Sequence, residues 1–254
     1  CLVVRQEAEG IRRYCHLATG KYNVRTAGIY SALGLFTCRE TFAQDLTELF
    51  NLLTGYTRPQ KFNHMLLAPI GLREHFLNQV RKEADNARAG RPARIIAKIN
   101  SLIDPAVIEE LYRASQAGVQ IDLIVRGMCS LRPGIAGLSE RIRVISIIDR
   151  YLEHARVFYF HNGGEPNYWL ASADWMPRNF DRRIEIAFPV LDKQHQAKLK
   201  EILEVQIADT IKGWQMQRDG AYLRGPVSAN NNSRSQDRLY ELMQGECAAT
   251  PAMV

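Results

Sequence analysis

Hydrophobic and polar residues follow two different periods along this chain, and each period predicts one kind of element. Apolar residues at helical spacing predict four helices, over residues 40–54, 72–89, 105–117 and 192–214. Short apolar runs predict six strands, at residues 93–99, 119–125, 142–148, 155–160, 168–172 and 184–190. Because strands and helices alternate, the pattern favours an α/β fold.

The strand, helix and strand between residues 93 and 125 predict how part of the sheet is built. A unit of this kind with short connections places its two strands parallel. We therefore expect a mixed, largely parallel sheet flanked by helices over residues 65–224.

The two ends of the chain have a different pattern. Residues 1–23 predict two short strands joined by a charged turn, and residues 29–37 predict another strand-like run. A breaker-rich connection follows at 54–59. The polar residues 225–254 predict a mostly disordered tail with one short helix near 237–243.

The composition is that of a soluble globular protein, with 254 residues, 46% hydrophobic and 24% charged. Its apolar runs are far shorter than the ~20 residues that a membrane span needs. The net charge of +6 favours a polyanionic partner. Five scattered cysteines without a C-x-x-C spacing predict a reduced, cytoplasmic chain that lacks a zinc site.

The richest set of candidate chemical groups begins at His154 and Arg156, which alternate with apolar residues and so share one face of a strand. A neutral imidazole beside guanidinium groups suits phosphate, because arginine binds the oxygens while histidine attacks or donates a proton. Further polar candidates follow downstream: Ser172, Asp174, Arg178 and Arg183. The alternative is a surface histidine on an edge strand, surrounded by solvated arginines.

Three other residues lie at predicted strand ends. Arg126 precedes Gly127 at the carboxyl end of a strand, where open parallel sheets bind ligands and where backbone amides could approach an anion. His16 and Tyr30 are equally consistent with structural roles. Because the chain has no G-x-x-x-x-G-K-[ST] or G-x-G-x-x-G motif, nucleotide binding by those loops is not supported.

A weak internal repeat connects the two ends of the chain. Residues 17–21 (LATGK) resemble residues 170–174 (LASAD), and each segment is followed at a similar distance by another apolar strand. A duplicated fold of this kind can place two half-sites face to face.

Three long motifs, RGMCSLRP at 126–133, SIIDRYLEH at 146–154 and LASADWMPRN at 170–179, resemble bacterial polyphosphate kinases of the large, histidine-phosphorylated type. The C-terminal half of that family consists of two phospholipase D-like domains. The resemblance implies that residues 1–60 are the end of the first domain and residues 65–224 the whole second domain. Residues 225–254 lie outside it.

The resemblance also implies roles for single residues. His154 matches a histidine that contacts the nucleotide phosphates and assists transfer, and Arg126 and Tyr30 match ATP-binding positions. His16 matches a further family histidine that is not phosphorylated, and it is kept with His154 as a catalytic candidate. The expected phosphate-binding set is Tyr30, Arg126, His154, Arg156, Ser172, Asp174, Arg178 and Arg183.

The implied reaction is reversible transfer of the terminal phosphate of ATP to inorganic polyphosphate through a phosphohistidine. The nucleophilic histidine and the groups that hold Mg²⁺ are expected upstream of Cys1, so no metal ligand is expected within this chain and the chain alone is expected to be inactive. This chain differs from the family at two places. The family usually has an acid where this chain has Ala32, and it usually has Gly-Thr-Gly-Asn where this chain has Ala-Thr-Gly-Lys at residues 18–21.

The expected partners are ATP or ADP and polyphosphate, with Mg²⁺ as the cofactor. We expect a cytoplasmic homo-oligomer with no nucleic acid and no membrane span, although peripheral membrane association is compatible with the charge. Two alternatives remain open. One is a phospholipase D-like phosphodiesterase, which needs two His-x-Lys half-sites, and the other is a non-catalytic polyanion-binding module.

Overall fold

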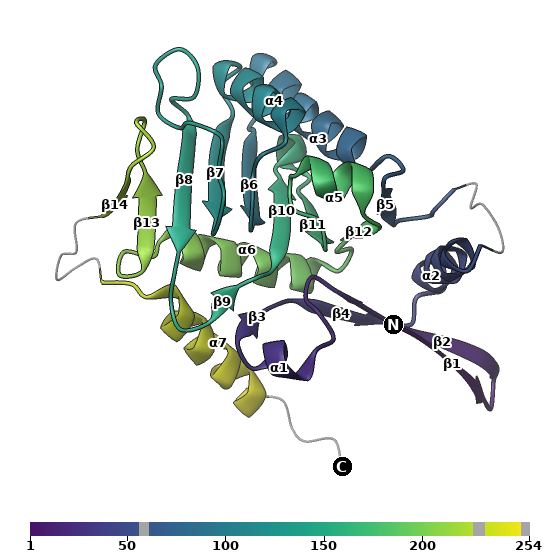
Figure 1. Cartoon of the computed structure of the whole chain (residues 1–254). Coiled ribbons are helices and arrows are strands. Elements are labelled where there is room, and N and C mark those ends of the chain that lie inside the picture. Colours follow the sequence, from purple (N-terminus) through teal and green to yellow (C-terminus); the bar gives the residue numbers. More distant parts are fainter. Residues whose placement is uncertain (56–60, 226–231, 250–254) are drawn as a thin grey trace.

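The computed structural model describes residues 1–55, 61–225 and 232–249. Over these residues it contains a nine-stranded sheet in the order β14-β13-β8-β7-β6-β10-β11-β12-β5 (Figure 1). Its strands, in chain order, are β5 (Leu66–Ala68), β6 (Arg94–Ile99), β7 (Gln120–Val125), β8 (Ile142–Ile147), β10 (Arg156–Phe160), β11 (Asn167–Ala171), β12 (Glu185–Pro189), β13 (Gly213–Met216) and β14 (Tyr222–Arg224).

The sheet is mixed, as predicted, but the prediction of a largely parallel sheet is wrong. In the described part of this sheet, only the pairs β6–β7 and β7–β8 are parallel. The other neighbours in this sheet pair antiparallel. The connection from β10 to β11 is short, and a short connection allows only an antiparallel neighbour, whereas β11 and β12 are joined by a longer segment that contains α5. The strand–helix–strand unit from β6 to β7 is parallel because a helix crosses between its strands.

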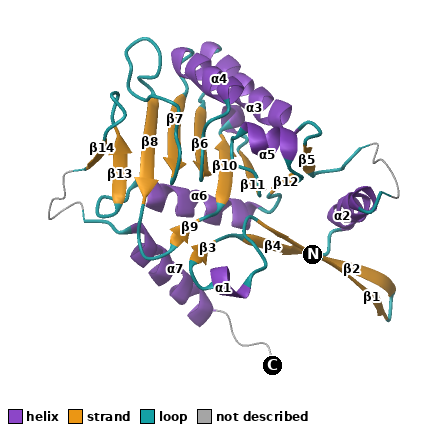
Figure 2. Cartoon of the chain, viewed as in Figure 1, coloured by secondary structure: helices purple, strands orange, loops and turns teal. Residues whose placement is uncertain are grey.

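Helices cover both faces of the sheet (Figure 2). Alternate residues of one strand point to opposite faces, so Ile95 and Ala97 belong to one buried cluster and Ile96 belongs to another. The first cluster includes apolar residues of α3 and α4, and the second includes residues of α2 and α6. The helices are α2 (Glu40–Leu53), α3 (Leu72–Arg88), α4 (Pro105–Gln116), α5 (Pro177–Arg182), α6 (Lys193–Ile207) and the short turn η1 (Asn162–Gly164).

Side-chain caps confirm two of the predicted helix starts, those of α4 and α6. The side chain of Asp104 accepts a hydrogen bond from the Val107 amide at 3.1 Å, and Pro105 occupies the first turn of α4. Asp192 caps α6 by accepting from the Gln194 amide at 2.8 Å. No helix in the described ranges is long and apolar enough to cross a membrane.

The N-terminal residues form a second, smaller sheet and a contact with the large unit. Strands β1 (Leu2–Glu7), β2 (Gly10–Ala18) and β4 (Gly34–Thr37) make an antiparallel sheet in the order β1-β2-β4. Helix α1 (Val24–Ala27) leads to β3 (Tyr30–Ser31), which pairs in parallel with β9 (Leu152–Glu153). This pairing brings the N-terminal segment against the connection between β9 and β10, which contains His154.

Two predictions near the C-terminus differ from the structure. The helix predicted to run to residue 214 ends at Ile207, because Asp209 then accepts hydrogen bonds from the amides of Ile211, Lys212 and Gly213 and turns the chain into β13. The tail predicted to be mostly disordered contains helix α7 (Ser235–Ala249), longer than the predicted helix at 237–243. Residues 226–231 and 250–254 of that tail lie outside the described residues.

Candidate active site

One edge of the large sheet brings together most of the predicted site residues. Strands β6, β7 and β11 end at this edge, while the antiparallel strands β10 and β12 begin there. The side chains of Arg126, Arg156 and Asp174 therefore converge, although they are far apart in the sequence. The segment between β2 and β4 lies against the same edge, since the carbonyl of Thr19 accepts from Arg156 Nη1 at 3.1 Å.

Arg156 and Asp174 form a buried pair. Nε and Nη2 of Arg156 donate to the two carboxylate oxygens of Asp174, each at 3.1 Å. Nη1 of Arg156 donates to the carbonyls of Thr19 and His154. Because its donors are directed at the protein and the side chain is 8% exposed, Arg156 supports the site's framework. Its predicted contact with phosphate has no support in this geometry.

Asn100 joins the buried pair to Arg126. The backbone amide and Nδ2 of Asn100 donate to Asp174 at 2.7 and 3.2 Å, while its Oδ1 accepts from Nε of Arg126 at 3.0 Å. The two Nη atoms of Arg126 have no hydrogen-bond partner in the described part of the chain, and the residue is half-buried. Arg126 is thus a guanidinium held in place at one nitrogen and free to bind an anion with the others.

The amide of Gly127 itself is not available to the anion that the sequence suggested for this loop. The amide of Gly127 donates to the carbonyl of Asn100 at 2.8 Å. A Cβ atom at Gly127 would lie 2.8 Å from that same oxygen, so glycine is needed here for the close approach of two backbones.

His154 lies beside this cluster and packs against Tyr30. The ring centroids of the two residues are 4.8 Å apart, and the amide of His154 donates to the carbonyl of Ser31 at 3.0 Å. The histidine is 8% exposed, and its Nδ1 is buried without a hydrogen-bond partner in the described ranges. The sequence alternative of a solvated surface histidine is therefore wrong.

Burial lowers the pKa of His154 to about 4, and the positive charges of Arg156 and Arg126 act in the same direction. In NMR titrations of the histidine Cε1–H signals, His154 is expected to titrate near that value. An unfolded histidine titrates near 6.5. Between pH 6.5 and about pH 4, the unfolded chain therefore carries a proton on this histidine that the folded chain does not carry. Stability is therefore expected to fall as the pH drops from about 6.5 toward 4. A His154 midpoint at the ordinary value would contradict this description.

The remaining predicted phosphate ligands lie farther along the same edge. The hydroxyl of Ser172 is bonded to Glu185 and accepts from the amide of Ile186 at 3.0 Å. Arg183 is exposed and lies 3.7 Å from Glu185. Arg178 is exposed on α5 and has no partner in the described residues. Of these residues, only the two arginines present guanidinium groups at the surface.

The shared layout predicted from the internal repeat is present in three dimensions. Ser172 and Ile186, 14 residues apart, are joined by an amide–carbonyl bond of 2.9 Å and by the amide–hydroxyl bond of 3.0 Å. Thr19 and Leu33, also 14 residues apart, are joined by the same two bonds at 2.9 and 3.0 Å. The two segments therefore have equivalent backbone positions at the ends of paired strands.

His16 belongs to a different cluster from His154. Its ring stacks on Phe36 with centroids 4.2 Å apart, and its Nδ1 is bonded to the hydroxyl of Tyr22. Cys15 and Leu17, on either side of it, point into the core, so His16 points to the opposite face of β2. The structure therefore does not bring His16 together with the His154 cluster.

Sequence reasoning missed three residues next to His154. Lys98 and Glu153 form a buried ion pair with a separation of 2.9 Å, and Asn100 bridges Arg126 and Asp174. Asn100 directly follows a buried strand, which is a signal for a site residue that could have been used. Lys98 lies within an apolar run and Glu153 belongs to a charged stretch, so neither offered such a signal.

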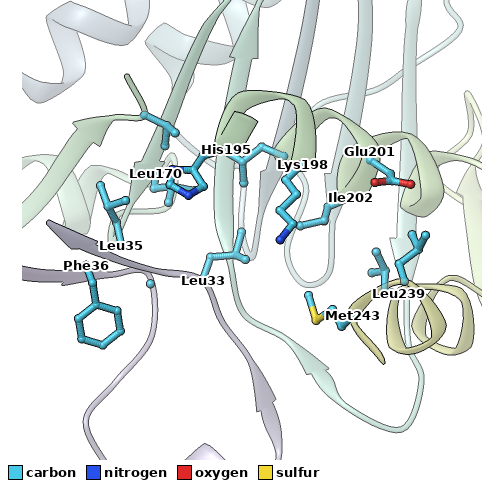
Figure 3. Close-up of a pocket in the computed structure, with 14 residues that line it drawn as sticks. Leu33, Leu35, Phe36, Leu170, His195, Lys198, Glu201, Ile202, Leu239 and Met243 are labelled. Atoms are coloured by element: carbon cyan, nitrogen blue, oxygen red, sulfur yellow. The ribbon is translucent and has the colours of Figure 1, made fainter. Parts of the chain in front are cut away.

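A separate cavity of about 540 Å³ lies between α6, α7 and β4 (Figure 3). Leu239 and Met243 of α7 face Ile202 of α6 across it, with Leu33 nearby. None of the predicted site residues lines this cavity.

The carboxylates nearest to His154 are already engaged by the protein. Asp174 accepts from Arg156 and Asn100, and Glu153 is paired with Lys98. In the part of the chain that is described, no group of three or more His, Cys, Asp or Glu side chains could hold a metal ion. We therefore assign no step to Mg²⁺.

Two family models match this chain. The model described as Polyphosphate kinase C-terminal domain 2 matches residues 65–236. The model described as Polyphosphate kinase C-terminal domain 1 matches residues 1–59.

Individual proteins agree with the family models. A polyphosphate kinase of Thermosynechococcus vestitus is 56% identical over 221 residues, which cover 87% of this chain and 30% of that protein. One of Synechocystis sp. is 52% identical over 236 residues, covering 92% of this chain and 32% of that protein. The crystal structure of polyphosphate kinase from Porphyromonas gingivalis matches with a TM-score of 0.91 and 38% identity, over 98% of this chain and 38% of that one. This chain thus spans about a third of the length of these relatives, and the predicted mixed α/β fold is confirmed.

Proposed function

The chain belongs to the polyphosphate kinase family, and we propose that its sheet edge binds the phosphate groups of ATP and assists their reversible transfer to inorganic polyphosphate. The observation that supports this most strongly is that a buried histidine, His154, lies within electrostatic reach of the anchored guanidinium of Arg126. The resemblance to this family implies that the reaction proceeds through a phosphohistidine. We assign its nucleophilic histidine to no residue of this chain.

Arg126 provides the charge in this proposal. Asn100 orients the guanidinium through Nε, and the Nη atoms remain available for phosphate oxygens. Burial lowers the pKa of Arg126, which nevertheless stays charged at neutral pH because arginine titrates far above that range. A charge in a partly dehydrated site interacts more strongly with a phosphoryl group than one in water.

His154 provides a proton-binding group in the same place. It is neutral at neutral pH, because burial and two arginines lower its pKa to about 4. The negative charge of arriving phosphate oxygens favours the protonated imidazole and so raises that pKa. Bound phosphate thus favours the protonated form of His154, which donates a charge-assisted hydrogen bond to the transferring group.

The N-terminal and C-terminal segments each contribute to this site in the proposal. Residues 1–60 supply Tyr30 and the backbone around Thr19, while residues 65–224 supply the histidine and the arginines. Mg²⁺ enters as part of the ATP substrate and screens its phosphates. Homo-oligomer formation, a cytoplasmic location and peripheral membrane association stay predictions.

Replacing Arg126 tests the binding step directly on this chain. Arg126→Ala is expected to weaken binding of ATP, added with Mg²⁺, by roughly 10- to 100-fold, because charge-assisted hydrogen bonds contribute about 1.5–3 kcal/mol. Arg126→Lys is expected to restore binding only partly, since a point charge cannot reproduce the two-pronged guanidinium. Isothermal titration calorimetry measures both variants.

Arg88→Ala is the matched control, because Arg88 is an exposed arginine on α3 that pairs with Asp85. An unchanged ATP affinity in Arg126→Ala would assign Arg126 to the framework. Because this chain alone is expected to be inactive, transfer of the γ-phosphate to polymer is measured in a chimaera in which this chain replaces the matching region of the T. vestitus polyphosphate kinase. Transfer distinguishes the kinase from a polyanion-binding module, and cleavage of a phosphodiester dye would favour the phosphodiesterase.

A further inference from the structure

A side chain of helix α7 holds the backbone that leads into His154. The amide of Tyr151 donates to Oε1 of Gln236 at 2.9 Å, and Nε2 of Gln236 donates to the carbonyl of Tyr151 at 2.8 Å. The same Nε2 donates to Oε1 of Glu153 at 2.8 Å. Gln236 is 9% exposed. Its amide group therefore satisfies both main-chain groups of Tyr151, as a neighbouring strand would.

Glu153 extends this contact to three other elements. Its second oxygen, Oε2, accepts from Lys98 of β6 at 2.9 Å and from the hydroxyl of Ser31 of β3 at 3.0 Å. Gln206 of α6 donates to the same oxygen at 2.9 Å. Burial disfavours the charged carboxylate, but Lys98 and the hydrogen bonds outweigh it and lower the pKa of Glu153. The residue that precedes His154 is thus a fixed, charged anchor.

The start of α7 is itself fixed, so Gln236 is held in place. Arg234 makes two hydrogen bonds to the carboxylate of Asp149, at 2.8 and 2.6 Å. The amide of Ser235 donates to Asp209 at 2.8 Å, and the Ser235 hydroxyl bonds to the same oxygen. Bidentate pairs of this kind restrict both distance and angle.

The ring of His154 has no side-chain hydrogen bond of this kind in the described residues. Its position therefore depends on its backbone and on its contact with Tyr30. We propose that Gln236 is a positioning residue, which holds the segment from Tyr151 to Glu153 so that the His154 ring stays buried against Tyr30. The expected effect of Gln236 on catalysis rests on the proposed role of His154. The expected effect of Gln236 on the position of the His154 ring does not rest on that role.

The surroundings of His154 provide a readout of its position. The charged groups that act on the ring are Arg126 after β7, Arg156 of β10, Asp174 after β11 and Lys21 after β2. Together with burial they lower its pKa to about 4. A ring released into water would approach the ordinary value of about 6.5. The pKa of His154 therefore reports whether Gln236 holds it.

The experiment replaces Gln236 with methionine, which preserves the side chain's length but removes its hydrogen bonds. Histidine-selective ¹³C labelling of this chain, with the signal assigned through His154→Gln, gives the pKa of His154. We expect a rise of at least about one pH unit in Gln236→Met. Arg238→Met, an exposed position on the same helix, is the control and should leave the pKa unchanged. An unchanged pKa in folded Gln236→Met would overturn the proposal.

If Gln236→Met does not fold, Gln236→Asn provides the same test, because its amide is one methylene too short to reach Tyr151. An unchanged His154 pKa in folded Gln236→Asn would overturn the proposal as well.

Activity is measured in a chimaera in which this chain replaces the matching region of the T. vestitus polyphosphate kinase. Gln236→Met is expected to lower kcat for polymer synthesis by roughly 10- to 100-fold, because small displacements of a reacting group are costly. The KM for ATP should stay within about twofold, since Arg126 is untouched. A raised pKa with unchanged kcat would support the positioning role and contradict the proposed function of His154. A reduced kcat with an unchanged pKa would overturn the positioning role.

Discussion

Replacing Arg156 with methionine is expected to lower the free energy of unfolding by about 3–5 kcal/mol, the usual effect of leaving a buried charge without its partner. The partner is Asp174, which is 7% exposed and receives two hydrogen bonds from Arg156. The substitution also leaves the carbonyls of Thr19 and His154 without a donor. Urea denaturation of this chain, followed by circular dichroism, measures the change.

Two further variants show whether the loss of stability comes from the broken ion pair. Arg183→Met removes an exposed guanidinium 3.7 Å from Glu185 and should change stability by less than about 0.5 kcal/mol. Adding Asp174→Asn to Arg156→Met removes the unpaired charge and should restore part of the loss. A loss below about 1 kcal/mol in Arg156→Met would mean that the pair is not a structural element.

Replacing His154 with glutamine in the T. vestitus chimaera is expected to reduce polymer synthesis by at least ~10²-fold, the usual contribution of a positioned acid or base. Glutamine is chosen because His154 is buried and packs on Tyr30, so alanine would leave a cavity. Transfer of radiolabelled γ-phosphate into polymer is the measurement.

His16→Gln is the matched control, since His16 stacks on Phe36 in a separate cluster. We expect its activity to remain within about threefold of the unsubstituted chimaera, because its ring lies outside the His154 cluster. If His154→Gln were as active as the control while equally well folded, the assignment of His154 would be wrong.

The elements of this fold could be predicted where the hydrophobic pattern decides them. The alternation of Ile95, Ile96 and Ala97 between two cores and the cap at Asp104 follow from local sequence. Strand direction did not follow, because β10 pairs with β6 over more than fifty intervening residues. Helix α7 was predicted only in part, as a short helix at 237–243, because its start is held by distant partners such as Asp149.

The site was predictable in its residue types but not in its contacts. Arg126 and Arg156 look alike in the sequence, as arginines next to apolar strands. The structure separates them, because Asp174 fills the donors of Arg156 while the Nη atoms of Arg126 have no partner in the described residues. Such a distinction depends on which carboxylate folds beside which guanidinium. Spacing along the chain does not determine that.

The internal repeat could be predicted only in part from the sequence. The short likeness between residues 17–21 and 170–174 is weak as a sequence match. The equivalent bonds that Thr19 and Ser172 make to the next strand turn it into a structural equivalence. Neighbouring side chains differ: Glu185 is bonded to Ser172, whereas Ala32 lies against Gly20.

The most direct test of the central claim is an NMR titration of this chain with ATP and Mg²⁺, observed at the Cε1–H signals of its histidines. If the sheet edge binds phosphate, the His154 signal shifts and its pKa rises from about 4, because phosphate oxygens favour the protonated ring. The exposed His195 on α6 should not respond. Saturable ATP binding that leaves the His154 signal and its pKa unchanged would contradict the claim.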